Sequence, residues 1–148
     1  MKFTGAALTL IGMMAFGAFS AHGKVAAQAP KSQWDGIYTD AQAKRGEATY
    51  TEFCATCHGG DLSGGEMAPS LVGGEFASNW NDLSLGELFE RMRISMPQNA
   101  PGSLSRQQDA DILAFMLSKA GFPAGEIELA REAEVLKQIR FEAMKPSP

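Results

Sequence analysis

The segment Cys54-Ala55-Thr56-Cys57-His58 decides the interpretation of this chain, because it holds both cysteines and one of the two histidines. Two cysteines three positions apart, followed directly by histidine, form the pattern of c-type haem attachment. The two sulfur atoms lie about one helical turn apart, so both can reach one edge of a flat ring. Thioether bonds from Cys54 and Cys57 would hold the haem, and His58 would bind its iron. The segment therefore predicts one covalently bound haem c.

The N-terminal segment, residues 1–27, is typical of a secretory signal peptide. Lys2 precedes an apolar run over residues 6–19, and small residues follow up to Ala27. The run is shorter than the about 20 apolar residues that a membrane span needs. We expect cleavage after Ala27 and a periplasmic location, which agrees with attachment of c-type haem outside the bacterial cytoplasmic membrane. An uncleaved N-terminal anchor is the alternative.

Two other uses of a Cys-x-x-Cys pattern fit this chain less well. A thioredoxin-like redox pair belongs near a βαβ pattern, which the sequence does not show. A structural zinc site needs four ligands, usually cysteine or histidine. After residue 27 the chain offers three such residues, two of them adjacent. Haem attachment is therefore the preferred interpretation.

Length and charge restrict the class of protein further. Without residues 1–27 the chain has roughly 120 residues, enough for one small domain in which a haem would supply much of the core. Residues 28–148 carry 11 basic and 17 acidic side chains, a net charge of −6. This acidic balance argues against nucleic acid and anionic membranes as partners.

The remaining chain divides into a lead-in over residues 28–39, a domain over residues 40–122 and a C-terminal tail over residues 123–148. The domain shows helical periodicity and no alternating strand pattern, so we expect it to be all-α. Its segment over residues 59–79 is rich in glycine, serine and proline and is expected to be a loop over a bulky group. The tail has a weak helical pattern that predicts at most a short helix.

Capping signals predict where the helices of the domain begin. Thr39 or Asp40 can cap a helix that runs to about Cys54. Ser84 and Ser105 each open a capping box, with a glutamate or glutamine three positions on, and predict a second and a third helix.

A haem that only transfers electrons needs a second axial ligand, usually histidine or methionine. His58 is the only histidine after residue 27, so methionine is the candidate. Met96 lies at the end of the second predicted helix, where Pro97 favours an extended backbone. Met92 is the runner-up, and residues 28–148 also contain Met67, Met116 and Met144. Ligation by His58 and Met96 would leave no iron position for a substrate.

Across about Asp40 to Phe122 the chain resembles class I cytochrome c. Gly46 and Tyr50 look like contact residues of the family's N-terminal helix, and Phe115 like their aromatic partner on the last helix. The family packs these two helices nearly at right angles, which would explain a glycine in mid-helix. The resemblance implies an all-α fold of three or more helices wrapped around one covalently bound haem.

The resemblance implies roles for two further residues of the haem site. Pro69 begins a Pro-x-Leu segment whose proline carbonyl would accept a hydrogen bond from Nδ1–H of His58 and orient its ring. Trp80 is similar to a family tryptophan that hydrogen-bonds a haem propionate, with an ordinary half-buried aromatic as the alternative. The pair Met96-Pro97 resembles the Met-Pro pair of many bacterial members.

In function, the resemblance implies a periplasmic electron carrier that is not itself an enzyme. It would pass single electrons between redox proteins, from a donor dehydrogenase towards an acceptor cytochrome or oxidase. The stretches Met96 to Ser105 and Asp111 to Leu117 are loosely similar to bacterial cytochromes that serve quinoprotein dehydrogenases, so a haem subunit of such a complex is one alternative. A gas sensor or peroxidase-like protein with an open iron position is the other, if Met96 does not bind. The chain lacks the lysine ring of mitochondrial forms, which argues against an acidic oxidase docking site as its partner.

Overall fold

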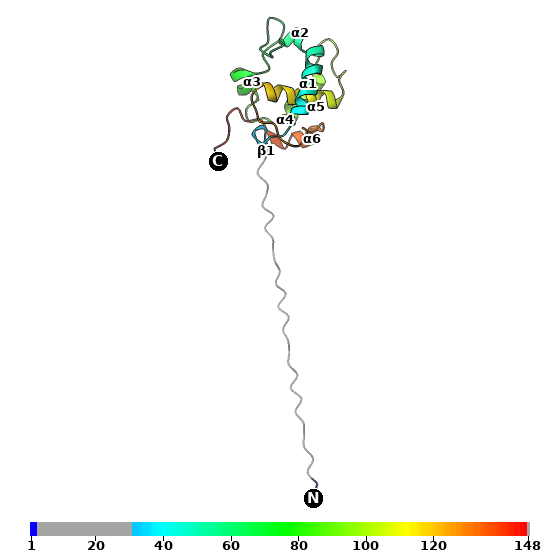
Figure 1. Ribbon diagram of the computed structural model, residues 1–148, viewed down its shortest axis with the longest axis vertical. Helices are drawn as coiled ribbons and strands as arrows, with labels where there is room; N and C mark the ends of the chain where they lie inside the picture. The colour runs from blue at the N-terminus through cyan, green and yellow to red at the C-terminus, as the bar shows by residue number, and fades with distance from the viewer. Residues whose placement is uncertain (3–30, 148) are drawn as a thin grey trace.

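Two crossing helices, α1 (Asp40–Phe53) and α5 (Arg106–Lys119), form the frame of the fold (Figure 1). The structure, a computed structural model, describes residues 1–2 and 31–147. Gly46 of α1 lies at the crossing, where an added Cβ would overlap the carbonyl of Asp111 in α5. The close approach therefore explains a mid-helix glycine that costs about 1 kcal/mol relative to alanine. The close crossing expected from the sequence is confirmed.

An ion pair beside the crossing ties the two helices together. Nε and Nη2 of Arg45 each lie 3.1 Å from an oxygen of the Asp111 carboxylate, and Nη1 lies 2.9 Å from Glu128. Gln107 donates a further hydrogen bond of 2.8 Å to Asp111. Asp111 is buried, and these donors compensate the loss of its hydration. The hydrogen bonds from Asp111 and Glu128 in turn raise the pKa of Arg45.

Side-chain caps set the starts of the long helices, as predicted. Thr39 accepts a hydrogen bond at the start of α1. Ser84 opens α4 (Leu85–Ser95) and Ser105 opens α5, each with both reciprocal hydrogen bonds of a capping box. At the end of α4, Met96 adopts an extended backbone with φ −123° and ψ 154°. This conformation is the one that a following proline favours.

The segment over residues 59–79 was wrongly predicted to be a loop throughout, because α3 (Gly73–Trp80) is a helix. No side chain caps its start at Val72, and it begins with two glycines, which are poor helix formers. Its sequence signal is the pair Phe76 and Trp80, four positions apart, whose ring centroids lie 6.2 Å from each other. Trp80 therefore ends α3.

The sequence also gave no sign of a short strand pair between the two ends of the described chain. β1 (Lys31–Ser32) pairs in parallel with β2 (Ile139–Arg140). Next to β1 lies a single turn, η1 (Gln33–Asp35), and before β2 the short helix α6 (Ala133–Leu136). Apart from these two-residue strands, the regular structure within residues 31–147 is helical, and the predicted all-α fold class is confirmed.

The C-terminal segment after residue 122 is part of the packed core. The side chains of Gln33 and Trp34 both donate hydrogen bonds to the carbonyl of Glu142. The hydroxyl of Tyr38 donates one of 2.6 Å to the carbonyl of Phe122. The lead-in and the C-terminal segment are therefore bound to each other and to the end of α5.

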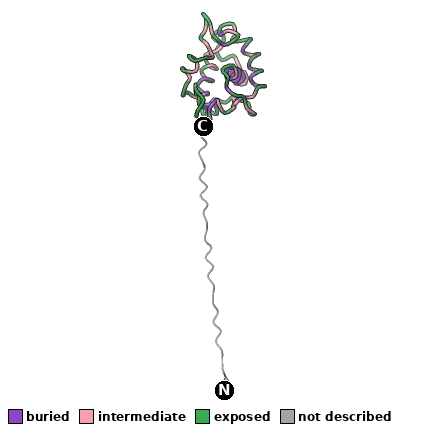
Figure 2. Tube along the Cα trace, turned by 60° about the vertical axis from the view of Figure 1, so that its left-hand side comes forward, coloured by how far each residue is buried: buried purple, intermediate pink, exposed green. Residues whose placement is uncertain are grey.

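The apolar side chains form two clusters, and α5 contributes to both. Buried residues, purple in Figure 2, gather in the interior of the fold. The large cluster joins α4 and α5 to the lead-in and the C-terminal segment, with fully buried members such as Phe89, Leu113 and Leu136. The small cluster consists of Tyr50, Leu62, Ile112, Phe115 and Met116.

The described part of the chain contains no helix that is long and apolar enough to cross a membrane. The segment expected to be a signal peptide, residues 1–27, lies outside the described residues except for residues 1–2.

Candidate haem site

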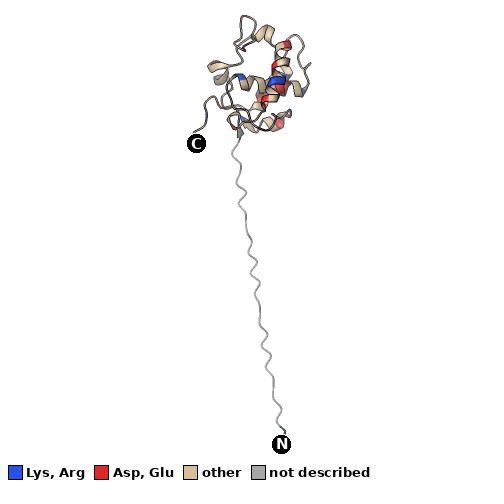
Figure 3. Ribbon diagram, viewed as in Figure 1, with Lys and Arg blue, Asp and Glu red and all other residues tan. Residues whose placement is uncertain are grey.

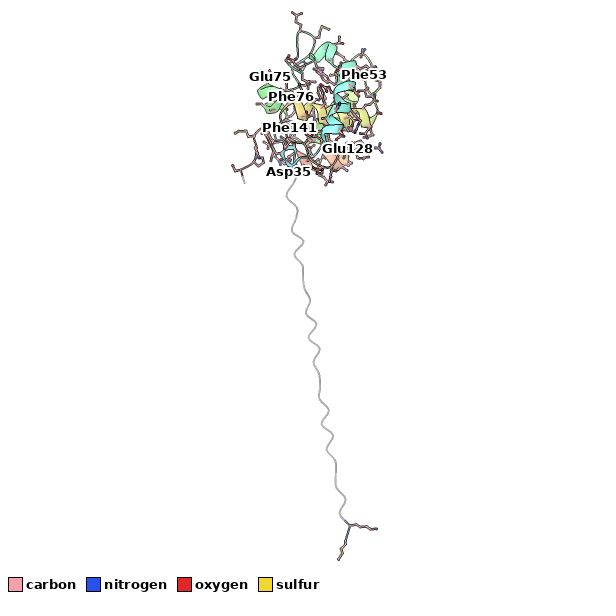
Figure 4. All side chains as sticks on the ribbon, in the orientation of Figure 1. Asp35, Phe53, Glu75, Phe76, Glu128 and Phe141 are labelled. Atoms are coloured by element: carbon pink, nitrogen blue, oxygen red, sulfur yellow. The ribbon has the colours of Figure 1, made fainter. Side chains whose placement is uncertain are left out.

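A cavity of about 860 Å³ lies against the small cluster. The end of α1, the haem motif, the loop over residues 59–72, α3, α4 and α5 all contribute to its wall. Figure 4 shows Phe53 of α1 and Phe76 of α3, two of its lining residues, on different sides of this region. Its volume is near the upper end of the range of about 300–1,000 Å³ for small-molecule sites. The cavity is therefore large enough for a bulky planar cofactor.

The haem motif forms one wall of the cavity through a tight turn. Cys54 closes α1, its N–H donating to the carbonyl of Tyr50 at 2.8 Å. The short helix α2 (Ala55–His58) follows at once, and the carbonyl of Cys54 accepts from the N–H groups of Cys57 and His58 at 3.1 and 3.0 Å. Cys54, Cys57 and His58 all line the cavity. The turn thus brings two sulfur atoms and an imidazole to the same wall.

Cys54 and Cys57 do not form a disulfide with each other. Burial raises the pKa of Cys54 to about 11, with smaller contributions from the charges of Asp109 and Cys57. Reactive redox thiols have a lowered pKa instead, so Cys54 does not have the electrostatics of a thioredoxin-like pair. In the described part of the chain, no group of three or more His, Cys, Asp or Glu side chains could hold a metal ion.

His58 is buried, and the loop after the motif fixes its ring. Its Nδ1 lies 2.8 Å from the carbonyl oxygen of Pro69, the contact that the resemblance to class I cytochrome c implies. A carbonyl only accepts, so Nδ1 carries the hydrogen and Nε2 keeps the lone pair. The backbone N–H of Gly64 donates to the His58 carbonyl at 2.8 Å and holds the loop close. Nε2 is therefore the nitrogen available to an iron ion in the cavity.

Tyr50 connects the motif to α5. Its hydroxyl donates a hydrogen bond of 2.7 Å to the carbonyl of Gly59, directly after the motif. Its ring centroid lies 5.3 Å from that of Phe115. Burial raises the pKa of Tyr50 to about 12, and the charges of Cys54 and Asp61 add to this, so the hydroxyl stays protonated. Tyr50 and Phe115 thus make the contact between helices expected from the sequence.

The structure narrows the choice of the second axial ligand. Four methionines line the cavity: Met67, Met92, Met96 and Met116. Met144 is 83% exposed and lies elsewhere. Met116 belongs to the small cluster, Met92 packs against both clusters, and Met67 is 77% exposed. Met96 is half-buried and packs in neither cluster, so it is the one cavity methionine that is neither part of an apolar cluster nor largely exposed.

Trp80 and Arg91 line the cavity and can donate hydrogen bonds to an anion. Arg91 is the one Lys or Arg among the lining residues of the described chain, and no ion pair of Arg91 is found within residues 31–147. Trp80 was a predicted site residue, whereas no pattern in the sequence singles out Arg91. Arg91 reaches the site because α3 and α4 line the same cavity.

These residues fit a haem. The wall is largely apolar, two thiols and an imidazole nitrogen share one side, and an uncommitted methionine completes the candidate ligands. A basic side chain and an indole N–H could hold the carboxylates of the ring. The roles of Cys54, Cys57, His58, Met96 and the other site residues as haem contacts stay predictions.

A comparison with protein families points to the same class. The profile of the family described as "Cytochrome C oxidase, cbb3-type, subunit III" matches residues 41–116, about half of the chain. Among solved structures, the crystal structure of the sulfane dehydrogenase SoxCD from Paracoccus pantotrophus is similar, with a TM-score of 0.48 and 19% identity. The alignment covers 88% of this chain and 67% of that chain, and a likeness of this extent bears on neither substrate nor partners. A comparison with curated proteins found no match.

Proposed function

We propose, from the premise that this chain belongs to the family described as "Cytochrome C oxidase, cbb3-type, subunit III", that it is a monohaem electron carrier of the periplasm. The chain is a class I c-type cytochrome, and its domain binds haem c. The observation that carries the proposal is the cavity wall on which Cys54, Cys57 and His58 meet. Two thioether bonds would attach one haem there, which supplies one-electron chemistry when bound.

His58 and Met96 are the proposed axial ligands. The hydrogen bond to Pro69 would fix the imidazole plane and leave Nε2 as the nitrogen that binds the iron. A thioether is a soft ligand that favours the ferrous ion, so Met96 would raise the reduction potential relative to a second histidine. With both positions filled by the protein, no substrate can bind iron. Such a site exchanges electrons and does not catalyse a reaction of a bound substrate.

Trp80 and Arg91 are the proposed partners of the haem propionates. Both side chains line the cavity, and both are donors. The charge of Arg91 would offset the negative charge of a propionate carboxylate and make this hydrogen bond a strong one. The two residues would therefore fix the orientation of the ring.

The proposed partners are other redox proteins, such as a donor dehydrogenase and an acceptor cytochrome or oxidase. The haem motif and the loop after it, residues 54–72, contain no Lys or Arg (Figure 3). Since a ring of lysines is missing beside the attachment site, the partner surface need not be acidic. Apolar and weakly charged contacts would then dominate the encounter.

The optical spectrum of the purified protein and its reaction with carbon monoxide test this function. We expect a low-spin oxidised spectrum with the weak long-wavelength band of Met–Fe(III) ligation, and a ferrous form that does not bind carbon monoxide rapidly. A high-spin spectrum with rapid binding would instead favour a gas sensor or peroxidase-like protein. Co-purification with a quinoprotein dehydrogenase from the native host would place the chain as a haem subunit of that complex.

The location is tested by fractionation and mass spectrometry. The protein is expected in the periplasmic fraction with Gln28 as its first residue and the mass of one haem added. Recovery in the membrane fraction with an uncut N-terminus would show an anchored protein instead.

A further inference from the structure

Asp109 in α5 is a buried acid that the haem site does not use. It is 1% exposed, and within residues 31–147 neither of its carboxylate oxygens has a hydrogen-bond partner. A buried carboxylate without partners loses its hydration and gains nothing in return. Asp111, two positions on, is also buried but receives hydrogen bonds from Arg45 and Gln107. Asp109 is therefore unusual even within its own helix.

The charged groups around Asp109 leave it poorly neutralised. They are Glu90 and Arg93 of α4, Arg106 of α5 and the thiol of Cys54 at the end of α1. Arg93 makes two hydrogen bonds to Glu90, of 3.1 and 2.8 Å, and Arg106 lies 3.7 Å from the same carboxylate. Both arginines are thus directed towards Glu90. Protonation is the remaining way for Asp109 to avoid a buried charge.

Asp109 is close enough to the cavity for its charge to act there. It precedes Ile112 by one helical turn and Met116 by two, and both of these line the cavity. Its carboxylate also raises the pKa of Cys54, a predicted haem attachment residue. In the other direction along α5, Asp109 lies about one helical turn from Ser105, the exposed residue that caps the helix. A proton therefore has a short path between Asp109 and solvent.

We propose that Asp109 takes up a proton when the haem in this cavity is reduced and releases it on oxidation, an inference that rests on the proposed function. One electron arrives from the redox partner and converts ferric to ferrous iron. One proton moves from solvent to an oxygen of Asp109 and forms an O–H bond. Oxidation returns the electron to the acceptor and the proton to solvent, so charge and atoms balance without a further reactant.

The direction of the coupling follows from the charges. The pKa of Asp109 is raised to about 6, mainly by desolvation. Among the nearby charges, Arg93 lowers this pKa, Glu90 raises it and Arg106 lowers it. Reduction removes one positive charge from the cavity, which raises the pKa further. Between the pKa of the oxidised state and the higher pKa of the reduced state, the reduction potential must fall as the pH rises. Outside this window Asp109 has the same charge in both states and no longer makes the potential depend on pH.

Reduction potentials of the holoprotein, measured from about pH 4 to about pH 8, test the proposal. The wild type should show a potential that falls with pH near and above 6, by a part of the about 59 mV per tenfold change in proton concentration that complete coupling gives. Asp109→Asn should remove this slope. Asp111→Asn is the matched control on the same helix and should retain it. A flat wild-type profile, or a slope that Asp109→Asn leaves in place, would overturn the proposal.

Infrared difference spectra between the reduced and oxidised wild type test the proton uptake without any variant. Reduction of the wild type should produce the C=O absorption of a newly protonated carboxyl group, and its absence would contradict the proposal. A protein with no reversible one-electron couple would refute the proposed function itself. A reversible couple that is independent of pH would refute only the role of Asp109.

Discussion

The two apolar clusters are closed in different ways. The large cluster is filled by the chain itself, since Leu136 and Phe141 of the C-terminal segment are completely buried against α4 and α5. The small cluster borders a cavity of about 860 Å³. One half of the interior is therefore specified by side chains alone, whereas the other half needs the haem as a part of the core.

The cavity shows why stability should depend on the haem. The space of about 860 Å³ beside the small cluster has a largely apolar wall and is not filled by side chains. Without the haem, these apolar side chains would face water and would not gain the stabilisation that burial gives. We therefore expect the haem-free chain to be less stable than the holoprotein.

The largest effect is expected from removal of both attachment residues. The double variant Cys54→Ala and Cys57→Ala should lose covalent haem and much of its helix content, because the small cluster cannot close. Far-ultraviolet circular dichroism of the purified variant measures the loss, with the wild-type holoprotein as the control. A variant that lacks haem and keeps the full helix signal would show that the small cluster is closed without it.

The large cluster is tested by Leu136→Ala in α6. Loss of this fully buried side chain should lower the free energy of unfolding by about 2–5 kcal/mol. The haem spectrum should not change, since Leu136 does not line the cavity. Val135→Ala, at the exposed neighbouring position, is the matched control and should change stability by less than about 1 kcal/mol. Equal losses in the two variants in guanidinium unfolding would argue against a core role of α6.

The crossing that joins the clusters is tested by Gly46→Ala. The added methyl group would overlap the carbonyl of Asp111 and push α1 away from α5, at a cost of about 1–3 kcal/mol. Gly60→Ala is the control, because a Cβ there meets no atom within 4 Å. Thermal unfolding of the two holoproteins should separate them clearly. Equal midpoints would mean that the helices can move apart without cost.

The smallest effect is expected from Tyr50→Phe. The change removes the hydrogen bond to the Gly59 carbonyl but keeps the ring against Phe115, so the loss should be about 1 kcal/mol. Thr51→Val, which removes an exposed hydroxyl from the next residue, is the control. Denaturant unfolding measures the free energy of unfolding of both variants. If Tyr50→Phe is as stable as the control, the Tyr50 hydroxyl does not stabilise the fold.

Local signals in the sequence predicted much of this fold. The caps at Thr39, Ser84 and Ser105 need only residues within one turn, so the starts of α1, α4 and α5 were predicted correctly. The start of α3 has no side-chain cap and two glycines, so the same reasoning missed it. The pairing of β1 with β2 joins positions more than 100 residues apart through two residues each, and no local pattern reveals it.

In the site, too, the local features were predictable and the packing was not. The haem motif and the Met-Pro pair each consist of consecutive residues and could be recognised without a structure. The position of Arg91 in the cavity wall depends on how α3, α4 and α5 surround the cavity, and the unpaired burial of Asp109 depends on how α4 packs against α5. The sequence shows neither. Met67 and Met116 also line the cavity. Contact with the cavity alone therefore does not identify the ligand.

The proposed role of Met96 as the second axial ligand is tested most directly by the optical spectra of Met96→Ala and Met92→Ala as oxidised holoproteins. We expect Met96→Ala to keep its covalent haem, lose the long-wavelength Met–Fe(III) band, become high-spin and bind carbon monoxide when reduced. Met92→Ala should keep the band. If Met96→Ala retains the wild-type spectrum and Met92→Ala loses it, Met92 is the ligand and the proposed role of Met96 is wrong.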